Sequence, residues 1–520
     1  MSGKRIEYQP LYYAIFAIIG LWLGKYLYQD SLLPNFNFSQ GHRGKIEDVL
    51  QTIDQYYVDS VNSSELTEES IRKLLDQLDP HSYYLTAEQI KYEEEQMQGN
   101  FSGIGIEFRI IQDTLTVLHP IKDGPSEKAG IQAGDKIIEV DGKAFTGPAI
   151  NSDKAMSTLR GPIGSEVELL LLQNGESSRQ IITRGEIPLP SVDHSQFIQP
   201  GVGYIKVTRF GAQTTQEFKT ALEGLSTENK LERLIIDLRD NPGGLMHSVV
   251  QISELFLRKG QQIVYTKGRT EEEDYTASED GPFADLPLTV LINENSASAS
   301  EILAGCMQDN DRATVIGRRS FGKGLVQRSF YLNDGSSFRL TIARYYTPVG
   351  RCIQKDYSHG KEEYEEEAQN RINNGELLYK DSIQLPDSLK FKTPGGKVVY
   401  GGGGIVPDIF VPIDTNLNVS AVTSENLELL NEYLVKHFYF WRAKLNGLNL
   451  SEANQYLDQH LALHLQQFLA DQQGAENLKP LIPLGEQRIK SKLLQDLHGK
   501  KGLYYNLLEE DLMIQKALQN

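Results

Sequence analysis

The spacing of hydrophobic residues changes several times along the 520-residue chain, and each change predicts a different kind of element. Between residues 41 and 98, apolar residues such as Ile46, Val49 and Ile53 recur every three or four positions, which predicts an N-terminal helical region. From residue 99 to 186, short apolar runs separated by glycine turns replace this period, which predicts a small domain built of strands.

Residues 187–413 combine the two patterns. Three apolar runs, at residues 203–207, 233–238 and 288–292, have the length of buried strands. The last two lead into segments with helical spacing, so this region predicts an α/β unit.

Two further segments differ in composition. Residues 355–390 are charged and include an acidic run at 362–367, which predicts a helical insertion between core strands with its acidic side in solvent. Residues 414–520 return to helical spacing and predict a C-terminal helical extension. The predicted fold class is therefore α/β in a multidomain chain with a helical region at each end.

The first 40 residues predict a signal anchor and a linker. Lys4 and Arg5 precede a mostly apolar segment at residues 11–24, which has the polarity and length of a short membrane-spanning helix or a signal sequence. No small-x-small cleavage site stands out after it, so an uncleaved anchor is favoured over a cleaved signal. We expect one anchor in the cell (inner) membrane and the body of the chain on the periplasmic side.

Charge and cysteine content narrow the possible partners. The net charge of −18 argues against nucleic acid. The two cysteines are too few for a disulfide framework or a cysteine metal site. His460 and His464 have the spacing of zinc ligands, but Leu461 stands where an H-E-x-x-H motif needs its glutamate. We therefore expect no metal and no other cofactor.

Candidate chemistry follows the run at 288–292. Ser298 is expected where this strand turns into a helix, and free N–H groups at a helix start favour a developing negative charge. Lys323 lies between two glycines, so its amine can be buried and its pKa lowered. A serine becomes nucleophilic when a base takes its proton, which predicts a serine–lysine pair with Gln327 orienting the amine. Taken singly, each residue is better explained by an ordinary role, Ser298 as a helix cap and Lys323 as a loop charge.

A glycine pair offers a further functional loop. Gly243 and Gly244 lie between the predicted strand at 233–238 and a helix. Outward N–H groups at such a helix start are suited to stabilise an oxyanion. A plain tight turn is the alternative.

Residues 129–142 carry the run A-G-I-x-A-G-D-x-I-x-x-V-D-G, which strongly resembles a PDZ domain. The resemblance implies a groove that takes a peptide as an added strand and holds its terminal carboxylate on backbone N–H groups. The matching carboxylate loop is formed by Gly103, Ile104, Gly105 and Ile106. Its glycines allow successive N–H groups to converge on an anion.

Taken together, residues 45–413 resemble the C-terminal processing (tail-specific) peptidases, a family of serine–lysine endopeptidases. The motifs that carry the resemblance are L-D-P-H-S at 78–82, the PDZ run, D-L-R-D-N-P-G-G at 237–244, S-A-S-A-S-E at 296–301, F-G-K-G-L-V-Q at 321–327 and G-I-V-P-D at 404–408.

The resemblance implies a crotonase-like layered core with an inserted PDZ domain. It also assigns the roles: Ser298 as nucleophile, Lys323 as base, Gln327 as its support, and the N–H groups of Gly244 and Ala299 as oxyanion donors. Ser296 and Ser300 are then structural.

The favoured function is a membrane-anchored endopeptidase that binds proteins with free C-termini and cleaves near that end. One alternative is a binding protein that holds clients without cleaving them. Another is a Ser–His–Asp hydrolase that uses His247, although the chain has no G-x-S-x-G motif. We expect the extension at 414–520 to bind an adaptor or a second copy of the chain.

Overall fold

The computed structural model describes residues 44–520, apart from residues 112 and 174 and the segments 415–423, 473–477 and 479–480. The chain divides into two compact units, Met1–Leu75 and Asp76–Asn520. In the first unit, helices α2 (Lys45–Tyr56) and α3 (Ser63–Leu75) follow the predicted helical period. The predicted anchor at 11–24 lies outside the described residues. Within the described ones, no helix is long and apolar enough to cross a membrane.

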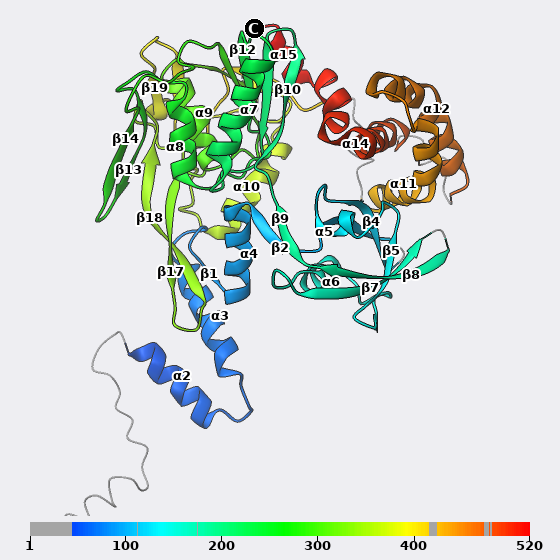
Figure 1. The fold of residues 1–520 in the computed structure, drawn as a ribbon. Coiled ribbons are helices and arrows are strands. Elements are labelled where there is room, and N and C mark those ends of the chain that lie inside the picture. Colours follow the sequence, from blue (N-terminus) through cyan, green and yellow to red (C-terminus); the bar gives the residue numbers. More distant parts are fainter. Residues whose placement is uncertain (1–43, 112, 174, 415–423, 473–477, 479–480) are drawn as a thin grey trace, which may run out of the picture. The chain divides into compact units, whose positions relative to one another are not determined.

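The core of the second unit is a six-stranded sheet with the order β10-β11-β12-β15-β16-β21 (Figure 1). Strands β11 to β21 run parallel, and β10 is antiparallel to β11. Their bounds are β10 (Val192–Gln199), β11 (Val202–Val207), β12 (Arg233–Asp237), β15 (Leu288–Ile292), β16 (Thr314–Gly317) and β21 (Ile409–Phe410). The parallel strands end at one edge of the sheet, where the candidate site begins.

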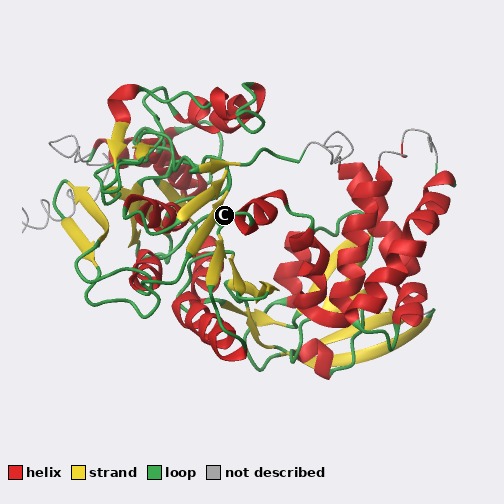
Figure 2. Ribbon diagram, turned by 90° about the horizontal axis from the view of Figure 1, so that it is seen from above, coloured by secondary structure: helices red, strands yellow, loops and turns green. Residues whose placement is uncertain are grey.

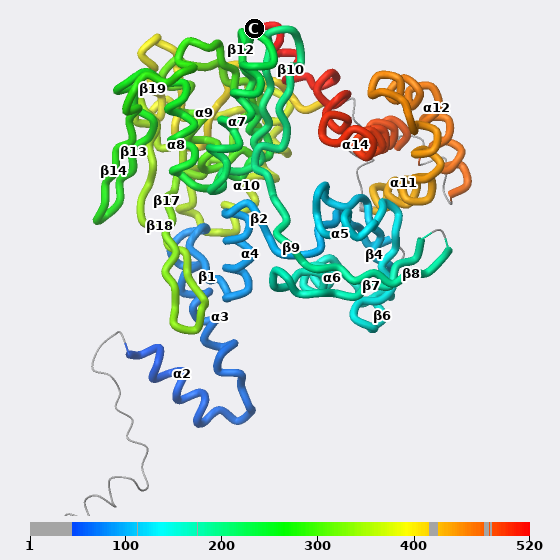
Figure 3. Tube along the Cα trace, viewed as in Figure 1, coloured from blue at the N-terminus to red at the C-terminus, as the bar shows by residue number. Residues whose placement is uncertain are grey.

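Both faces of this sheet are buried, which explains why its strands are continuous apolar runs. Leu234 and Ile236 face the helices α7 (Thr214–Glu228), α8 (Met246–Glu254) and α9 (Ala299–Asp309). Ile235, between them, faces the opposite side, where it packs with Ile514 of helix α15 (Leu512–Leu518). A segment from the far end of the chain thus completes the core (Figure 3).

A second, antiparallel sheet has the order β1-β18-β13-β14, with β17 also paired to β18. Its strands are β1 (Tyr83–Leu85), β13 (Gln262–Gly268), β14 (Glu272–Thr276), β17 (Leu325–Tyr331) and β18 (Ser337–Tyr346). The loop that contains Lys323 joins β16 of the first sheet to β17 of the second.

The predicted strand-rich domain is a third sheet, ordered β3-β4-β5-β7-β8, with β6 on β5. The elements are β3 (Ile106–Ile111), β4 (Thr114–Pro120), α5 (Pro125–Lys128), β5 (Lys136–Val140), β6 (Lys143–Ala144), α6 (Ser152–Leu159), β7 (Glu166–Gln173) and β8 (Glu176–Thr183). A ribbon of β2 (Asn100–Gly103) and β9 (Gly185–Pro188) joins it to helix α4 (Ala87–Gln98) and the core. Strand β3 is an edge strand, and no other described strand pairs with its second side.

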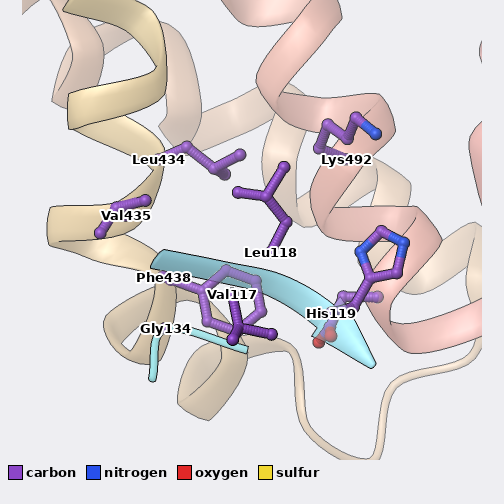
Figure 4. Close-up of a pocket in the computed structure, with 9 residues that line it drawn as sticks. Val117, Leu118, His119, Gly134, Leu434, Val435, Phe438 and Lys492 are labelled. Carbon is purple, nitrogen blue, oxygen red and sulfur yellow. The ribbon is translucent and has the colours of Figure 1, made fainter. Parts of the chain in front are cut away.

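The C-terminal region is helical, as predicted, with α11 (Ser424–Leu445), α12 (Leu450–Ala470) and α14 (Leu481–Glu509) around their own apolar core (Figure 2). This bundle packs against the β3–β4 hairpin, where Leu118, Leu434 and Phe438 line a small cavity (Figure 4). Lys492 of α14 pairs with Glu107 of β3 at 3.1 Å. The extension therefore contacts both the strand-rich domain and the core sheet.

The predicted charged insertion is partly buried. Helix α10 (Lys361–Asn373) exposes most of its glutamates, but Tyr364 and Arg371 are each 5% exposed. The 3₁₀ turns η1 (Lys380–Ser382) and η2 (Asp387–Leu389) and the hairpin of β19 (Lys390–Lys392) and β20 (Val398–Tyr400) follow it. Tyr364 and Arg371 face the loop that contains Lys323, as described below.

Candidate active site

Ser298 lies in a strained turn at the carboxyl edge of the core sheet. Strand β15 ends at Ile292, helix α9 begins at Ala299, and Ser298 between them has φ +56° and ψ −116°. A residue with a β-carbon adopts a positive φ only when its surroundings enforce it, and such strain is concentrated at functional sites. The buried hydroxyls of Ser296 and Ser300 donate to the carbonyl oxygens of Leu238 and Asn241 (both 2.9 Å) and hold the turn.

The glycine pair lies directly against this turn. A β-carbon on Gly243 would be 2.7 Å from Cβ of Ser298, so no larger residue fits there without movement. Gly244 has φ +140°. Neither the N–H of Gly244 nor the N–H of Ala299 donates a hydrogen bond to any described residue. Two free N–H groups beside a hydroxyl are what oxyanion stabilisation requires.

Lys323 is partly buried in the loop between β16 and β17. Its neighbours are glycines: Gly322 has φ +91°, and a β-carbon on Gly324 would lie 2.8 Å from the backbone nitrogen of Gln354. Burial lowers the pKa of the Lys323 amine, and the positive charge of Arg339 lowers it further. Both effects increase the fraction of neutral amine, the form that can act as a base.

Glu301 joins the serine turn to the lysine loop. Its carboxylate, fully buried, accepts hydrogen bonds from the N–H groups of Ser298 (2.8 Å), Lys323 (2.8 Å) and Gly322 (2.7 Å) and from the Ser320 hydroxyl (2.5 Å). Burial raises the pKa of the Glu301 carboxyl group to about 7. The hydrogen bonds act in the opposite direction and lower this pKa, but the effect of burial is larger. Glu301 was not among the predicted site residues. The sequence does contain a signal for this contact, because a glutamate three residues after a helix-capping serine can accept a hydrogen bond from the N–H of that serine.

His81 is a second residue that the sequence analysis did not assign to the site. The side chain of Gln327 donates to the His81 carbonyl oxygen, and His81 Nε2 lies 2.7 Å from the Tyr364 hydroxyl of α10. Burial, and then the charge of Lys323, lower the pKa of His81 to about 4. Gln327 therefore contacts the L-D-P-H-S turn. That it orients the Lys323 amine stays a prediction.

Helix α10 supports the lysine loop from outside. Arg371 donates to the carbonyl oxygens of Ser320 (3.0 Å) and Arg319 (2.6 Å) and pairs with Glu376 at 2.8 Å. The Lys355 amine lies over the ring of Tyr364, and its nitrogen is 4.0 Å from the ring centroid. Such contacts between distant segments cannot be predicted from local spacing.

Among the described residues, none of the other candidate histidines hydrogen-bonds to this cluster. His247 is exposed in the first turn of α8. His464 Nδ1 lies 3.0 Å from the Tyr433 hydroxyl, and His460 Nδ1 lies 2.8 Å from the Tyr456 carbonyl oxygen. In the described part of the chain, no three acidic, histidine or cysteine side chains gather as metal ligands.

The predicted carboxylate loop joins β2 to the edge strand β3. Gly103 ends β2, Ile106 begins β3, and Gly105 between them has φ +74°. The Ile104 side chain is buried in the core of this domain. The loop therefore lies at the start of the edge strand β3.

Comparison with known proteins agrees with this architecture. The model of peptidase family S41 matches residues 201–360, and the PDZ domain model matches residues 102–180. A carboxy-terminal-processing protease of Bartonella bacilliformis is 36% identical over 352 residues, which cover 65% of this chain and 80% of that protein. A probable CtpA-like serine protease of Staphylococcus aureus is 34% identical over 340 residues, 65% of this chain and 66% of that protein, just under two thirds of its length.

A solved structure, the photosystem II D1 C-terminal processing protease, is 26% identical and covers 70% of this chain and 92% of its own. The two structures superpose with a TM-score of 0.36. The matches in sequence are sufficient: the chain belongs to peptidase family S41, and it is a serine protease of the carboxy-terminal-processing group that carries a PDZ domain.

Proposed function

We propose that this protein is an endopeptidase in which Ser298 is the nucleophile and Lys323 the general base. The observation that carries the proposal is the shared carboxylate of Glu301, which binds the backbone N–H of both residues and so ties the strained serine to a lysine of lowered pKa.

The proposed reaction begins with neutral Lys323, which takes the Ser298 proton while Oγ attacks a peptide carbonyl carbon. The N–H groups of Gly244 and Ala299 stabilise the oxyanion. The protonated Lys323 then gives its proton to the leaving amine. Water, activated by the same amine, hydrolyses the acyl-enzyme. Gln327, whose side-chain N–H donates to the His81 carbonyl oxygen, is proposed to orient the Lys323 amine through its own side-chain carbonyl.

Substrate selection is proposed to begin at the PDZ domain. Gly103, Ile104, Gly105 and Ile106 hold the terminal carboxylate of a substrate, and the tail pairs with the open edge of β3. This arrangement favours cleavage near the C-terminal end of a protein. The anchor at 11–24 is proposed to keep the catalytic part on the periplasmic side of the inner membrane, where exported proteins are the substrates. Binding of an adaptor or a second copy by residues 414–520 stays a prediction.

The test uses the purified full-length protein and an unfolded protein with a free apolar C-terminus. We expect cleavage near that end, loss of activity in Ser298→Ala and Lys323→Ala, and slower cleavage after amidation of the tail. A fluorophosphonate should label Ser298 in the wild type.

Activity that survives Lys323→Ala and is lost in His247→Ala would instead identify a histidine base. Binding of the tail without any cleavage by the wild type would support a binding protein.

A further inference from the structure

The hydroxyl of Tyr345 lies between the backbones of the two proposed reacting residues. Its oxygen is 2.5 Å from the carbonyl oxygen of Lys323 and 3.1 Å from the carbonyl oxygen of Ser298. The residue is 1% exposed and belongs to the core beneath the site. One buried oxygen atom therefore contacts both the serine turn and the lysine loop.

Strand β18 fixes the position of this hydroxyl. The Tyr345 N–H donates to the Gly324 carbonyl oxygen at 3.0 Å, and Leu325 pairs with Arg344 in the β17–β18 ladder. Burial raises the pKa of the Tyr345 phenol well above its usual value, so the hydroxyl keeps its proton and remains a donor.

Tyr345 complements Glu301. Glu301 accepts hydrogen bonds from the N–H groups of Ser298 and Lys323, whereas Tyr345 lies against the carbonyl oxygens of the same two residues. The Ser298 carbonyl also accepts bonds from two N–H groups of α9. The Lys323 carbonyl has no donor other than Tyr345 among the described residues. The loop is also tied to the serine turn through Glu301 and by the Phe321 N–H, which donates to the Ser296 carbonyl oxygen at 3.0 Å. Tyr345 is the link that acts on the Lys323 carbonyl itself, and it is lost without the hydroxyl.

We propose that Tyr345 is a positioning residue that sets the separation of the serine turn and the lysine loop. In this role it fixes the Lys323 backbone relative to the backbone of Ser298. The inference rests on the proposed function, because it has meaning only if these two residues react. A displacement of about 1 Å in such a pair costs about 100-fold in rate.

The experiment replaces the hydroxyl in the full-length protein. For Tyr345→Phe we expect kcat to fall by about 10- to 100-fold while KM stays within about twofold, since the peptide-binding surface is unchanged. The rate of fluorophosphonate labelling at Ser298 should fall by a similar factor. Circular dichroism is used to verify that the variant is folded at the assay temperature. The matched control is Tyr346→Phe, because Tyr346 is the next residue of β18 and stacks on Tyr265 instead.

Two further variants separate the hydrogen bond from the volume of the side chain. Replacement of Tyr345 by 4-methylphenylalanine fills the space without a donor, and we expect the same loss of kcat. Replacement by 4-aminophenylalanine restores N–H donors at the same place, and we expect kcat to return to within about threefold of the wild type. This pair also decides the matter if Tyr345→Phe does not fold.

The proposal is overturned if the two variants without a donor keep kcat and labelling rates within twofold of the wild type. Ser298→Ala and Lys323→Ala are measured in the same assay. If both are inactive and the donor-free variants are active, only the role of Tyr345 is wrong. If either alanine variant keeps wild-type activity, the proposed function fails, and the role of Tyr345 fails with it.

Discussion

At the scale of single residues, the site depends on a lysine that must lose its proton. Burial and the charge of Arg339 lower the pKa of Lys323 below that of a free amine, about 10.4. If Lys323 is the base, activity requires its neutral form and rises with pH through this lowered pKa.

We therefore expect the rising limb of kcat/KM to have its midpoint below pH 10.4. Arg339→Gln should move this midpoint to higher pH, because the amine loses a positive neighbour. The control is Arg328→Gln, an exposed arginine of β17 that pairs with Glu271. A midpoint that is the same in wild type and Arg339→Gln would contradict this origin of the lowered pKa.

The lowered pKa of His81 predicts that the free energy of unfolding depends on pH. This pKa is about 4 in the folded protein and about 6.5 in an unfolded chain. As pH falls from 6.5 to 4, the unfolded state binds a proton that the folded state does not, so the free energy of unfolding decreases. With allowance for partial exposure, the loss is about 2 kcal/mol.

Denaturant titrations at several pH values measure this effect. Other groups titrate over the same range, so the informative quantity is the difference between wild type and His81→Gln. That difference should change between pH 6.5 and 4 and be constant above pH 7. A constant difference over the whole range would show that His81 is not held neutral in the folded state.

At the scale of elements, much of the fold followed from local pattern. The run at 288–292 is strand β15 with the same bounds, and a helix starts directly after Ser298, because both signals are local. The burial of Tyr364 and Arg371 did not follow, since their partners, His81 and Ser320, are distant in sequence. The same holds for Tyr345, whose role depends on the meeting of two loops.

Helix α10 should stabilise the lysine loop. Arg371→Met removes one partner of a buried ion pair and two hydrogen bonds to the loop. Arg319 still pairs with Glu376, so we expect a loss of about 3 kcal/mol, the lower end for such changes, and a fall in kcat.

The matched control is Glu366→Gln, an exposed residue of the same helix, which should change stability by less than about 0.5 kcal/mol. Chemical unfolding and peptide cleavage are measured on the same samples. Full stability in Arg371→Met would mean that α10 does not support the loop.

At the scale of the whole molecule, the contact between the helical extension and the PDZ domain can be tested with two glycines. Gly134 has φ +90°, and a β-carbon there would lie 2.8 Å from the Tyr439 ring of α11. Gly130 has φ +82° and no atom within 4 Å of such a β-carbon. Substitution by alanine thus imposes a similar backbone cost at both positions, about 1 kcal/mol, but a clash at only one.

We expect Gly134→Ala to be more destabilising than Gly130→Ala by about 1–3 kcal/mol, the usual cost of overpacking. Hydrogen exchange should also become faster in α11 and the β3–β4 hairpin of Gly134→Ala. Equal effects of the two substitutions would argue that this contact is not maintained in solution.

The bond between Arg239 and Asp511 also has a consequence for the order in which the protein matures. Arg239 lies just before the glycine pair, and its partner is made 272 residues later. At about 5–20 residues per second, this interval lasts about 15–55 s. Ser298 and Lys323 are therefore synthesised well before the segment that pairs with Arg239 and covers the second face of the core sheet. The newly made protein should therefore stay inactive until helix α15 has docked on the core sheet.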